Sequence, residues 1–400
     1  MRPRPLLFLA QNLPYPPDGG VKIRTFNVLR ELAKSFDVTT LCFMRETGRD
    51  PALALRALGE YGPIEAFPIP QLGSRTRMAW DHLRSVSMRH VYTRYMYESA
   101  RFGERLRYHR QRNAGAIIHF DTLDLATFLP LCDLQRVVCT HHNVESALLA
   151  RRAPLESAWW RRAYLGLQAS FMGAEEKMWC PRVRLNVAVS DVDAAELRRV
   201  APGANVTVVP NGVDTEFFQP LGHDEPAIAF VGGTTWFPNR DALEFFAGDI
   251  LPLLRAKRGD VRVRWIGRSS PGEMARYRRE GAIDMVGYVE DVRTAVGKAA
   301  CYIVPLRVGG GTRLKILDAW AMGKAVVSTS IGCEGLAAVD GHNILIRDEP
   351  CAFAEAVSSV LADEGLRARI GAQGRRTAED LYSWKVIGER MTQQYRETFK

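Results

Sequence analysis

Residues 309–323 read Gly309-Gly310-Gly311-Thr312-Arg313-Leu314-Lys315-Ile316-Leu317-Asp318-Ala319-Trp320-Ala321-Met322-Gly323. The glycines let backbone N–H groups come close to phosphate oxygens, and the first turn of the following helix adds partial positive charge. Arg313 and Lys315 add two cations that can neutralise a diphosphate. Asp318 follows about a turn and a half later, where a carboxylate can accept hydrogen bonds from ribose hydroxyls. The segment predicts a binding site for a sugar nucleotide.

Outside this segment, short apolar runs alternate with amphipathic stretches, a pattern typical of parallel sheets covered by helices. The predicted strands are residues 6–10, 38–43, 64–68, 116–120, 136–140, 186–189, 206–209, 227–231, 261–266, 283–286, 300–304 and 325–328. The pattern restarts after the turn-rich run Pro210-Asn211-Gly212-Val213-Asp214. We therefore predict an α/β fold with two doubly wound domains, at 1–214 and 215–382, and a helix at 383–400 that packs back toward the first domain.

The composition indicates a soluble globular protein with an acidic partner. The 400 residues are enough for about two domains, and 46% hydrophobic with 25% charged residues is ordinary for such a chain. The formal charge of +9 favours a phosphorylated metabolite, an anionic membrane surface or nucleic acid. Because the sequence shows no nucleic-acid-binding module, we expect no nucleic acid partner.

The N-terminus and the cysteines point to the cytoplasm. The apolar run at residues 6–10 is too short for a secretory signal, so we interpret it as a buried strand. No stretch reaches the roughly 18 apolar residues of a membrane span, so any membrane contact would be peripheral, at the inner face of the cytoplasmic membrane. The seven scattered cysteines fit buried thiols in a reducing compartment better than disulfides or a metal site.

Residues 75–112 mix cations with aromatic side chains, and Trp159-Trp160-Arg161-Arg162 forms a second such cluster. One interpretation is a solvated helical face whose aromatic side chains pack inward. The other is contact with an anionic lipid surface or a lipid-linked acceptor, because basic helices with tryptophan can lie at lipid headgroups.

Three segments of the first domain place polar groups where parallel strands end, which is where such sheets bind ligands. They are Gly19-Gly20 at the start of a helix that carries Lys22, His119 with Asp121, and His141-His142-Asn143. These groups could position a hydroxyl or share a proton. Each histidine taken alone fits a structural role, and the spacing does not fit a closed zinc site.

Three segments of the second domain repeat this arrangement. They are Gly232-Gly233 after a predicted strand, Arg268 one unit later, and Gly287-Tyr288-Val289. The first two place backbone N–H groups or a cation at the carboxyl ends of strands. The third offers backbone groups and the Tyr288 ring to a flat nucleotide base. A tight strand-to-helix turn explains each segment equally well.

Taken in order, these segments resemble the retaining, nucleotide-sugar-dependent glycosyltransferases of family four, also called glycosyl transferases group 1. The resemblance covers nearly the whole chain and also includes the runs 140–146 and 209–214. It implies the GT-B fold, in which two Rossmann-like domains face each other across a cleft. It also implies transfer from a nucleoside diphosphate sugar, held by the second domain, to an acceptor hydroxyl at the first.

The resemblance assigns roles to the residues above. The donor site would be Gly232, Gly233, Arg268, 287–289, 309–315 and Asp318. The acceptor side would be Gly19, Gly20, Lys22, His141, His142 and Asn143. His119 and Asp121 would lie near the reacting sugar, and Arg313 and Lys315 would stabilise the departing diphosphate without a metal or other cofactor. The acceptor would be a glycan or a lipid-linked molecule.

The chain departs from the family pattern at several positions. The family usually has two glutamates separated by seven residues, and here these positions hold Gly310 and Asp318. An Arg and a Lys that often follow the first strand of the second domain are replaced by Gly233 and Asn239. A nucleotide-sugar or glycan binding protein with impaired turnover therefore stays open, as does a GT-B epimerase or phosphorylase.

Overall fold

The computed structural model describes residues 3–45, 51–222, 225–259, 261–279, 283–309 and 313–400. The chain divides into two compact units. Unit 1 extends to Pro210 and takes in Ile387–Lys400, and unit 2 is Asn211–Val386. The division falls four residues before the predicted boundary at 214, and the first four residues of the predicted C-terminal segment belong to unit 2.

Unit 1 is built on a seven-stranded parallel sheet with the order β3-β2-β1-β4-β5-β6-β7. Its strands are β1 (Arg4–Ala10), β2 (Phe36–Met44), β3 (Ile64–Pro68), β4 (Ile117–Phe120), β5 (Val137–His141), β6 (Leu185–Ala188) and β7 (Val206–Val208). The central strand β1 is almost wholly buried, since Leu6, Phe8 and Leu9 have no exposed surface. A strand buried on both faces needs helices on both faces of the sheet.

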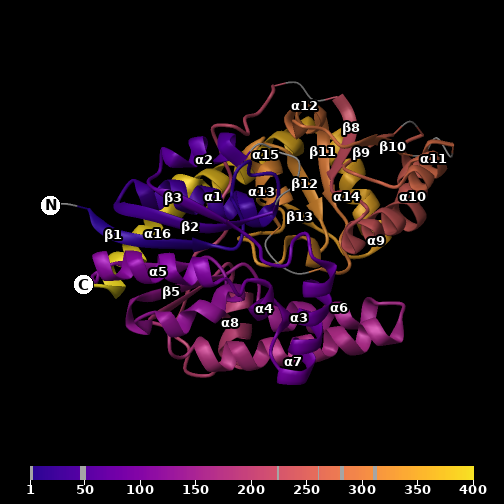
Figure 1. The fold of residues 1–400 in the computed structure, drawn as a ribbon. Coiled ribbons are helices and arrows are strands. Elements are labelled where there is room, and N and C mark those ends of the chain that lie inside the picture. The colour runs from indigo at the N-terminus through magenta and orange to yellow at the C-terminus, as the bar shows by residue number, and fades with distance from the viewer. Residues whose placement is uncertain (1–2, 46–50, 223–224, 260, 280–282, 310–312) are drawn as a thin grey trace. The chain divides into compact units, whose positions relative to one another are not determined.

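The helices of unit 1 surround this sheet in indigo to magenta in Figure 1. They are α1 (Gly20–Ala33), α2 (Pro51–Gly59), α3 (Arg75–Met88), α4 (Tyr92–Met96), α5 (Ala100–Arg112), α6 (Glu145–Arg152), α7 (Trp159–Trp179) and α8 (Asp191–Val200). Short 3-10 turns η1 (Leu123–Leu131), η2 (Leu134–Arg136) and η3 (Ala153–Leu155) connect them. Helix α1 presents Val28, Leu29 and Leu32 inward at helical spacing.

The last helix, α16 (Trp384–Thr398), lies against unit 1 from Ile387 onward and runs near β1 in Figure 1. Tyr395 is fully buried beside Phe36, with ring centroids 5.9 Å apart. Gly388 allows close approach, because a Cβ there would come within 2.4 Å of the Glu31 Cβ. The end of the chain therefore supplies part of the core of unit 1.

Unit 2 is built on a six-stranded parallel sheet with the order β10-β9-β8-β11-β12-β13. The strands are β8 (Glu225–Val231), β9 (Arg262–Ile266), β10 (Asp284–Gly287), β11 (Ala299–Val304), β12 (Ala325–Ser328) and β13 (Leu345–Ile346). The helices are α9 (Phe237–Phe245), α10 (Leu251–Lys257), α11 (Pro271–Arg279), α12 (Val292–Gly297), α13 (Leu314–Ala321), α14 (Pro350–Ala362) and α15 (Glu364–Thr377). Single turns η4 (Phe246–Ile250), η5 (Ile331–Cys333) and η6 (Ala378–Tyr382) complete the unit.

The predicted strands are confirmed, each within about two residues of its observed ends. Strand β13 is missed, because two residues are too few to show a hydrophobic period. Among the described residues, none of the helices has both the length and the apolar character needed to cross a bilayer.

Candidate functional site

The strand orders locate one ligand-binding edge in each unit. In unit 1 the chain order reverses between β1 and β4, and in unit 2 it reverses between β8 and β11. Open parallel sheets bind ligands outside the carboxyl ends of the strands at such a reversal. The predicted donor residues belong to the edge in unit 2, and the predicted acceptor residues belong to the edge in unit 1.

The cations of the glycine-rich segment are held at the start of α13 by neutral partners. Arg313, which is 6% exposed, donates from Nε and Nη2 to the Ile331 carbonyl at 3.2 and 3.0 Å. Lys315 donates from Nζ to Asn239 Oδ1 at 2.8 Å and lies 4.3 Å from the centroid of the Phe230 ring. Arg313 Nη2 also lies 3.9 Å from Glu334 Oε2. These contacts orient both side chains at the start of α13.

Burial changes the proton affinity of the two ionisable groups that follow Arg313. It lowers the pKa of Lys315 to about 7, and the charge of Arg313 acts in the same direction. It raises the pKa of Asp318 to about 7. Both shifts disfavour the charged form before a ligand binds. A diphosphate beside Lys315 would therefore favour its protonation.

The glycine loops after β8 and β9 pack against each other through their backbones. Gly267 has a φ of +143°, and a Cβ there would lie 2.5 Å from the Gly233 nitrogen. The Gly232 N–H already donates to the Ile266 carbonyl at 2.7 Å, and Trp265 Nε1 donates to the Gly232 carbonyl at 3.1 Å. The expectation that this turn offers free N–H groups to phosphate is thus wrong for Gly232, whose N–H links two strands.

The predicted base-binding segment lies beside Arg268. The Arg268 guanidinium carbon is 4.7 Å from the centroid of the Tyr288 ring, and that ring is 57% exposed. Gly287 has a φ of +85°, and its carbonyl accepts from the Gly267 N–H at 2.8 Å. Val289 packs on the core of unit 2. The structure therefore brings Arg268 and Tyr288 together with one exposed aromatic face.

The rest of the glycine-rich segment is described only in part. Gly310, Gly311 and Thr312 lie outside the described residues. A Cβ on Gly309, whose φ is +142°, would lie 3.1 Å from Arg313 Nη1, so this backbone is close to the guanidinium. Leu314 packs on the core of unit 2 and so has a packing role.

In unit 1 the predicted glycine pair stands at the start of α1. Gly20 is the first residue of the helix, and Gly19 precedes it in extended conformation. A Cβ on Gly19 would meet nothing within 4 Å, so this position is open to solvent or a ligand. Lys22 is half-buried and pairs with Asp18 Oδ1 at 3.0 Å.

The buried carboxylate of Asp121 is the centre of a polar network at the carboxyl end of β4. Its Oδ2 accepts from Thr25 Oγ1 at 2.6 Å and lies 3.2 Å from His142 Nε2. Its Oδ1 lies 3.7 Å from His119 Nε2. Burial alone would raise the pKa of Asp121, but the neighbouring His142 and His119 lower it well below its usual range. Asp121 is thus an anion throughout the neutral pH range.

His119 supports this carboxylate from the core. It has no exposed surface, its ring stacks on Phe8 with centroids 4.2 Å apart, and its Nδ1 is hydrogen-bonded to the Tyr395 hydroxyl. Burial lowers the pKa of His119, so the ring is neutral near pH 7. The neutral ring carries one proton, and the anion favours that proton on Nε2 while Nδ1 accepts from tyrosine. His119 acts through Asp121 as a positioning residue.

The three polar residues at the end of β5, His141, His142 and Asn143, divide between the core and the edge. His141 is buried, with Nε2 at 3.0 Å from Asn186 Oδ1, and burial lowers its pKa to about 4. His142 points to the opposite side and reaches Asp121. Asn143 Nδ2 lies 3.5 Å from Glu145 Oε1. The placement of His141 on the acceptor side is therefore wrong, because successive strand residues face opposite sides.

Sequence reasoning missed Thr25 and a group of carboxyls with raised pKa values near this edge. Burial raises the pKa of Glu145 to about 8, with Asp124 adding to the effect. Burial also raises the pKa of Asp124 and of Glu176, which accepts from Ser146 N at 3.2 Å. Thr25 lies on the same face of α1 as Val28 and Leu32, so its inward position was readable from the helical period.

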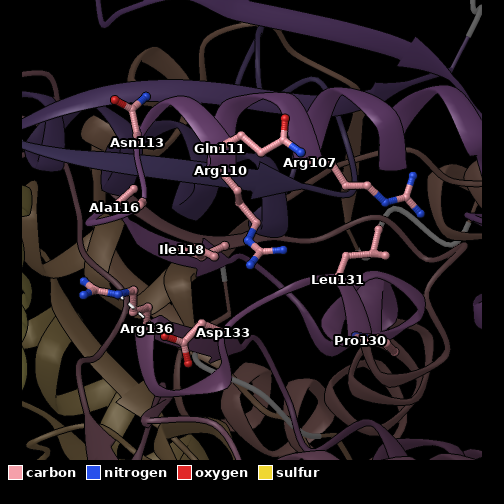
Figure 2. A pocket seen from close by; sticks show the side chains of 11 residues that line it. Arg107, Arg110, Gln111, Asn113, Ala116, Ile118, Pro130, Leu131, Asp133 and Arg136 are labelled. Carbon is pink, nitrogen blue, oxygen red and sulfur yellow. Dashed lines mark ion pairs between the residues drawn. The ribbon is translucent and has the colours of Figure 1, made fainter.

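A cavity of about 500 Å³ lies at the opposite, amino-terminal edge of the unit 1 sheet. Figure 2 shows the side chains that line it. Its lining includes Arg107, Arg110 and Arg136, and Arg136 pairs with Asp133 at 3.6 Å. None of the predicted site residues lines it. Among the described residues, no three His, Cys, Asp or Glu side chains gather as a metal site would require.

Comparisons with known proteins agree with this architecture. A family model described as Glycosyltransferase Family 4 matches residues 18–217, and one described as Glycosyl transferases group 1 matches residues 225–363. No curated protein sequence matches significantly.

Solved structures with the same fold cover nearly the whole chain. Sucrose-phosphate synthase from Thermosynechococcus elongatus has a TM-score of 0.68 at 18% identity, with 99% of each chain covered. Anabaena HepE in complex with UDP has a TM-score of 0.66 at 14% identity, covering 99% of this chain and 100% of its own. WaaG, described as a glycosyltransferase involved in lipopolysaccharide biosynthesis, has a TM-score of 0.63 at 14% identity, covering 98% and 99%.

Two doubly wound units of this kind, with these neighbours, define a GT-B fold. The protein is thus a GT-B enzyme that uses a nucleotide sugar. The chain belongs to glycosyltransferase family 4, whose model covers half of its residues.

Proposed function

We propose that the protein transfers a sugar, with retention of anomeric configuration, from a nucleoside diphosphate sugar to a hydroxyl of a glycan or lipid-linked acceptor. The observation that carries the proposal is the pair Arg313 and Lys315, oriented by a backbone carbonyl and an amide oxygen. These hydrogen bonds hold the two basic side chains in place at the start of α13. A diphosphate supplies the matching negative charge.

The chemistry follows from where charge develops. When the bond between the anomeric carbon and the diphosphate oxygen breaks, negative charge grows on the leaving phosphate, and preoriented cations stabilise it. The acceptor oxygen then forms the new bond on the same face of the sugar, and its proton passes to the departing phosphate oxygen. We propose that Arg313, Lys315 and the start of α13 stabilise the departing phosphate without a metal ion.

The other donor roles follow the same geometry. We assign residues 309–315 to the diphosphate, Asp318 to the ribose, and residues 287–289 with Arg268 to the base. Arg268 lies over the exposed Tyr288 ring, a surface on which a flat base can stack. Gly232 and Gly233 support this edge through their backbone contacts with the β9 loop. The UDP complex of HepE supports a nucleoside diphosphate as the ligand.

The acceptor roles are assigned to unit 1. We propose that Gly19, Gly20, Lys22, His142 and Asn143 line the acceptor side, with Asp121 and His119 behind them. The buried Asp121 fixes His142, whose ring is the more exposed end of the network. WaaG, with its stated part in lipopolysaccharide synthesis, supports a role in cell-surface polysaccharide or glycolipid synthesis at the cytoplasmic side of the membrane.

A panel of UDP, GDP, ADP and dTDP sugars tests the proposal. We expect slow release of nucleoside diphosphate from one of them without acceptor, faster release with a glycan or lipid-linked acceptor, and retained configuration in the product by proton NMR. The Arg313→Ala/Lys315→Ala double variant should lose release, whereas Arg307→Ala, at an exposed pair with Asp241, should not.

Gly310, at the position where the family usually carries a glutamate, keeps one alternative in view. A sugar-nucleotide or glycan binding protein with impaired turnover would bind one donor of the panel without releasing diphosphate. Tight binding of a donor, with nucleoside diphosphate released no faster than by the Arg313→Ala/Lys315→Ala variant, would favour that alternative.

A further inference from the structure

Three arginines line the cavity at the amino-terminal edge of the unit 1 sheet. Arg107 and Arg110 are three residues apart on α5 and so share one face of that helix. Arg136 reaches the same cavity from the turn η2. Figure 2 shows Arg107 and Arg110 leaving α5 on the cavity side, and Arg136 beside Asp133 at another part of the wall. Positive charge from two separate elements therefore gathers around one hollow.

The remaining arginines of α5 are each held by a neighbouring side chain. Arg105 Nη2 lies 2.6 Å from Glu65 Oε1, and Arg101 and Arg112 contact aromatic residues. In contrast, the two α5 arginines of the cavity make no hydrogen bond, ion pair or ring contact within the described part of the chain. Each guanidinium carries five N–H donors. The donors of these two side chains are therefore available to a ligand.

The carboxylate of Asp133 offsets only part of this charge. Asp133 Oδ2 lies 3.6 Å from Arg136 Nε, and its Oδ1 accepts from the Gln135 N–H at 3.1 Å. Arg136 Nη1 also donates to the Gly115 carbonyl at 3.0 Å, which fixes this side chain in the wall. Three guanidiniums against one carboxylate leave two net positive charges among the described lining residues. A concave surface with one sign of charge attracts an anionic ligand.

The rest of the wall is partly apolar. Ala116 and Ile118 are almost fully buried in the core of unit 1, and Leu131 packs on that core. The volume of about 500 Å³ is within the range of small-molecule sites. The planar fork of an arginine matches two oxygen atoms of a phosphate. The cavity thus suits a ligand with a phosphate at one end and a ring that can lie on apolar side chains.

We propose that this cavity binds a small soluble molecule with a phosphate monoester on a ring, the chemistry shared by sugar phosphates and nucleoside monophosphates. Arg107 and Arg110 bind the phosphate, Arg136 adds positive charge, and Ile118 and Leu131 contact the ring. None of the residues assigned to the donor or the acceptor lines the cavity, so the ligand is a third molecule. Its binding does not depend on the proposed transfer reaction.

Methyl NMR of the full chain with labelled isoleucine tests the proposal at the cavity itself. The Ile118→Val variant assigns the Ile118 δ1 methyl signal, and phenyl phosphate and glucose 6-phosphate are then titrated into the wild type. We expect a saturable shift of this signal with at least one of them. The neutral counterparts phenol and glucose should leave the signal unchanged, because they lack the charge that arginine binds.

Two matched double variants locate the phosphate. Arg107→Ala/Arg110→Ala should weaken the binding about ten-fold or more, because it removes both unpaired guanidiniums. Its Tm without ligand should match that of the wild type, since neither side chain has a partner to lose. Arg101→Ala/Arg112→Ala removes the same charge from the same helix outside the cavity. This control should bind within about two-fold of the wild type.

Equal affinity of the wild type and Arg107→Ala/Arg110→Ala would overturn the proposal. So would an equal loss in the two double variants, because binding would then follow net charge and not the cavity. An Ile118 signal that neither phosphate shifts would also contradict it. Vesicles containing phosphatidate separate a lipid headgroup from a soluble ligand. They should not displace the bound phosphate, and displacement by them would contradict a soluble ligand.

Discussion

The two candidate half-sites hold their charges in opposite ways. In unit 2, Arg313 and Lys315 are oriented by neutral oxygen atoms, and burial lowers the pKa of Lys315. In unit 1, Asp121 is enclosed by Thr25 and two histidines, which lower its pKa. A basic group that is oriented by neutral oxygen atoms can receive an anionic ligand, whereas a buried anion between two histidines is suited to fixing its neighbours. The difference suggests that unit 2 binds charge and that the unit 1 network positions His142.

The largest expected effect comes from the buried guanidinium. Arg313→Ala should lower kcat/KM for the donor by about 10²–10³-fold, because it removes a preoriented cation from the charge that develops on the leaving phosphate. The KM for the acceptor should change little. Initial rates at varied donor and acceptor concentrations check this. If the Arg313→Ala enzyme has normal donor kinetics, unit 2 does not use this cation to bind the charge of the donor.

The next effect is on the stability of unit 1. Asp121→Asn should lower the free energy of unfolding by about 2–3 kcal/mol near pH 7, because it removes the anion that His142 and Thr25 contact. The folded pKa of Asp121 lies below its unfolded value, so this stabilisation is complete above about pH 5 and is lost progressively as the pH falls further.

Urea unfolding of both proteins at pH 7, 5 and 3.5 measures this difference, which should shrink at the lowest pH. The control Asp18→Asn removes an exposed ion pair and should cost less than about 0.5 kcal/mol. A difference that grows toward low pH would show that the network is not built around a buried anion.

A smaller effect separates the ribose contact from the phosphate contact. Asp318→Asn should raise the donor KM about ten-fold, because an amide accepts a ribose hydroxyl less strongly than a carboxylate does. Asp318→Glu should retain near wild-type KM, and Asp284→Asn, at an exposed position on β10, should change nothing. Equal KM values for the Asn and Glu variants would argue against ribose recognition by this side chain.

The smallest expected effect is the uptake of a fraction of a proton when a diphosphate binds. Lys315 has a pKa of about 7 without ligand, so binding a diphosphate at pH 8 should take up as much as one proton. Asp318 is already mostly ionised at that pH. Calorimetric titration in buffers of low and high ionisation enthalpy reports the uptake, and the Lys315→Met variant should abolish it. Affinity should fall as pH rises from 7 to 9, and a rise would contradict the assignment.

The sequence predicted the strands of both sheets because each carries a compact apolar run, as at residues 64–68 and 325–328. It could not predict contacts such as the one between His119 and Tyr395, which are 276 residues apart. Both His141 and His142 were predicted on the acceptor side, and strand alternation could have shown that only one of these neighbouring residues faces it. The hydrogen bond of the Gly232 N–H could not be predicted either, because a glycine turn in a sequence does not reveal whether its N–H is already bonded.

The aromatic side chains of residues 75–112 and 159–162 fall into two groups, and each group fits one of the two interpretations of these segments. Tyr95 and Tyr97 pack inward, at 5% and 3% exposure. Trp80, Trp159 and Trp160 do not, so the expectation of inward packing is wrong for them. Composition alone could not separate these groups, because the burial of Ser85 depends on Gln168, a partner from α7.

The central claim is that unit 2 binds a nucleoside diphosphate through the cations at the start of α13. Thermal unfolding with UDP, GDP, ADP and dTDP tests it most directly, since a ligand that binds the folded state raises Tm in proportion to its occupancy and affinity. We predict that at least one of the four raises Tm of the wild type and of Arg307→Ala, but not of Arg313→Ala/Lys315→Ala. An equal rise in all three proteins, or in none, would contradict the claim.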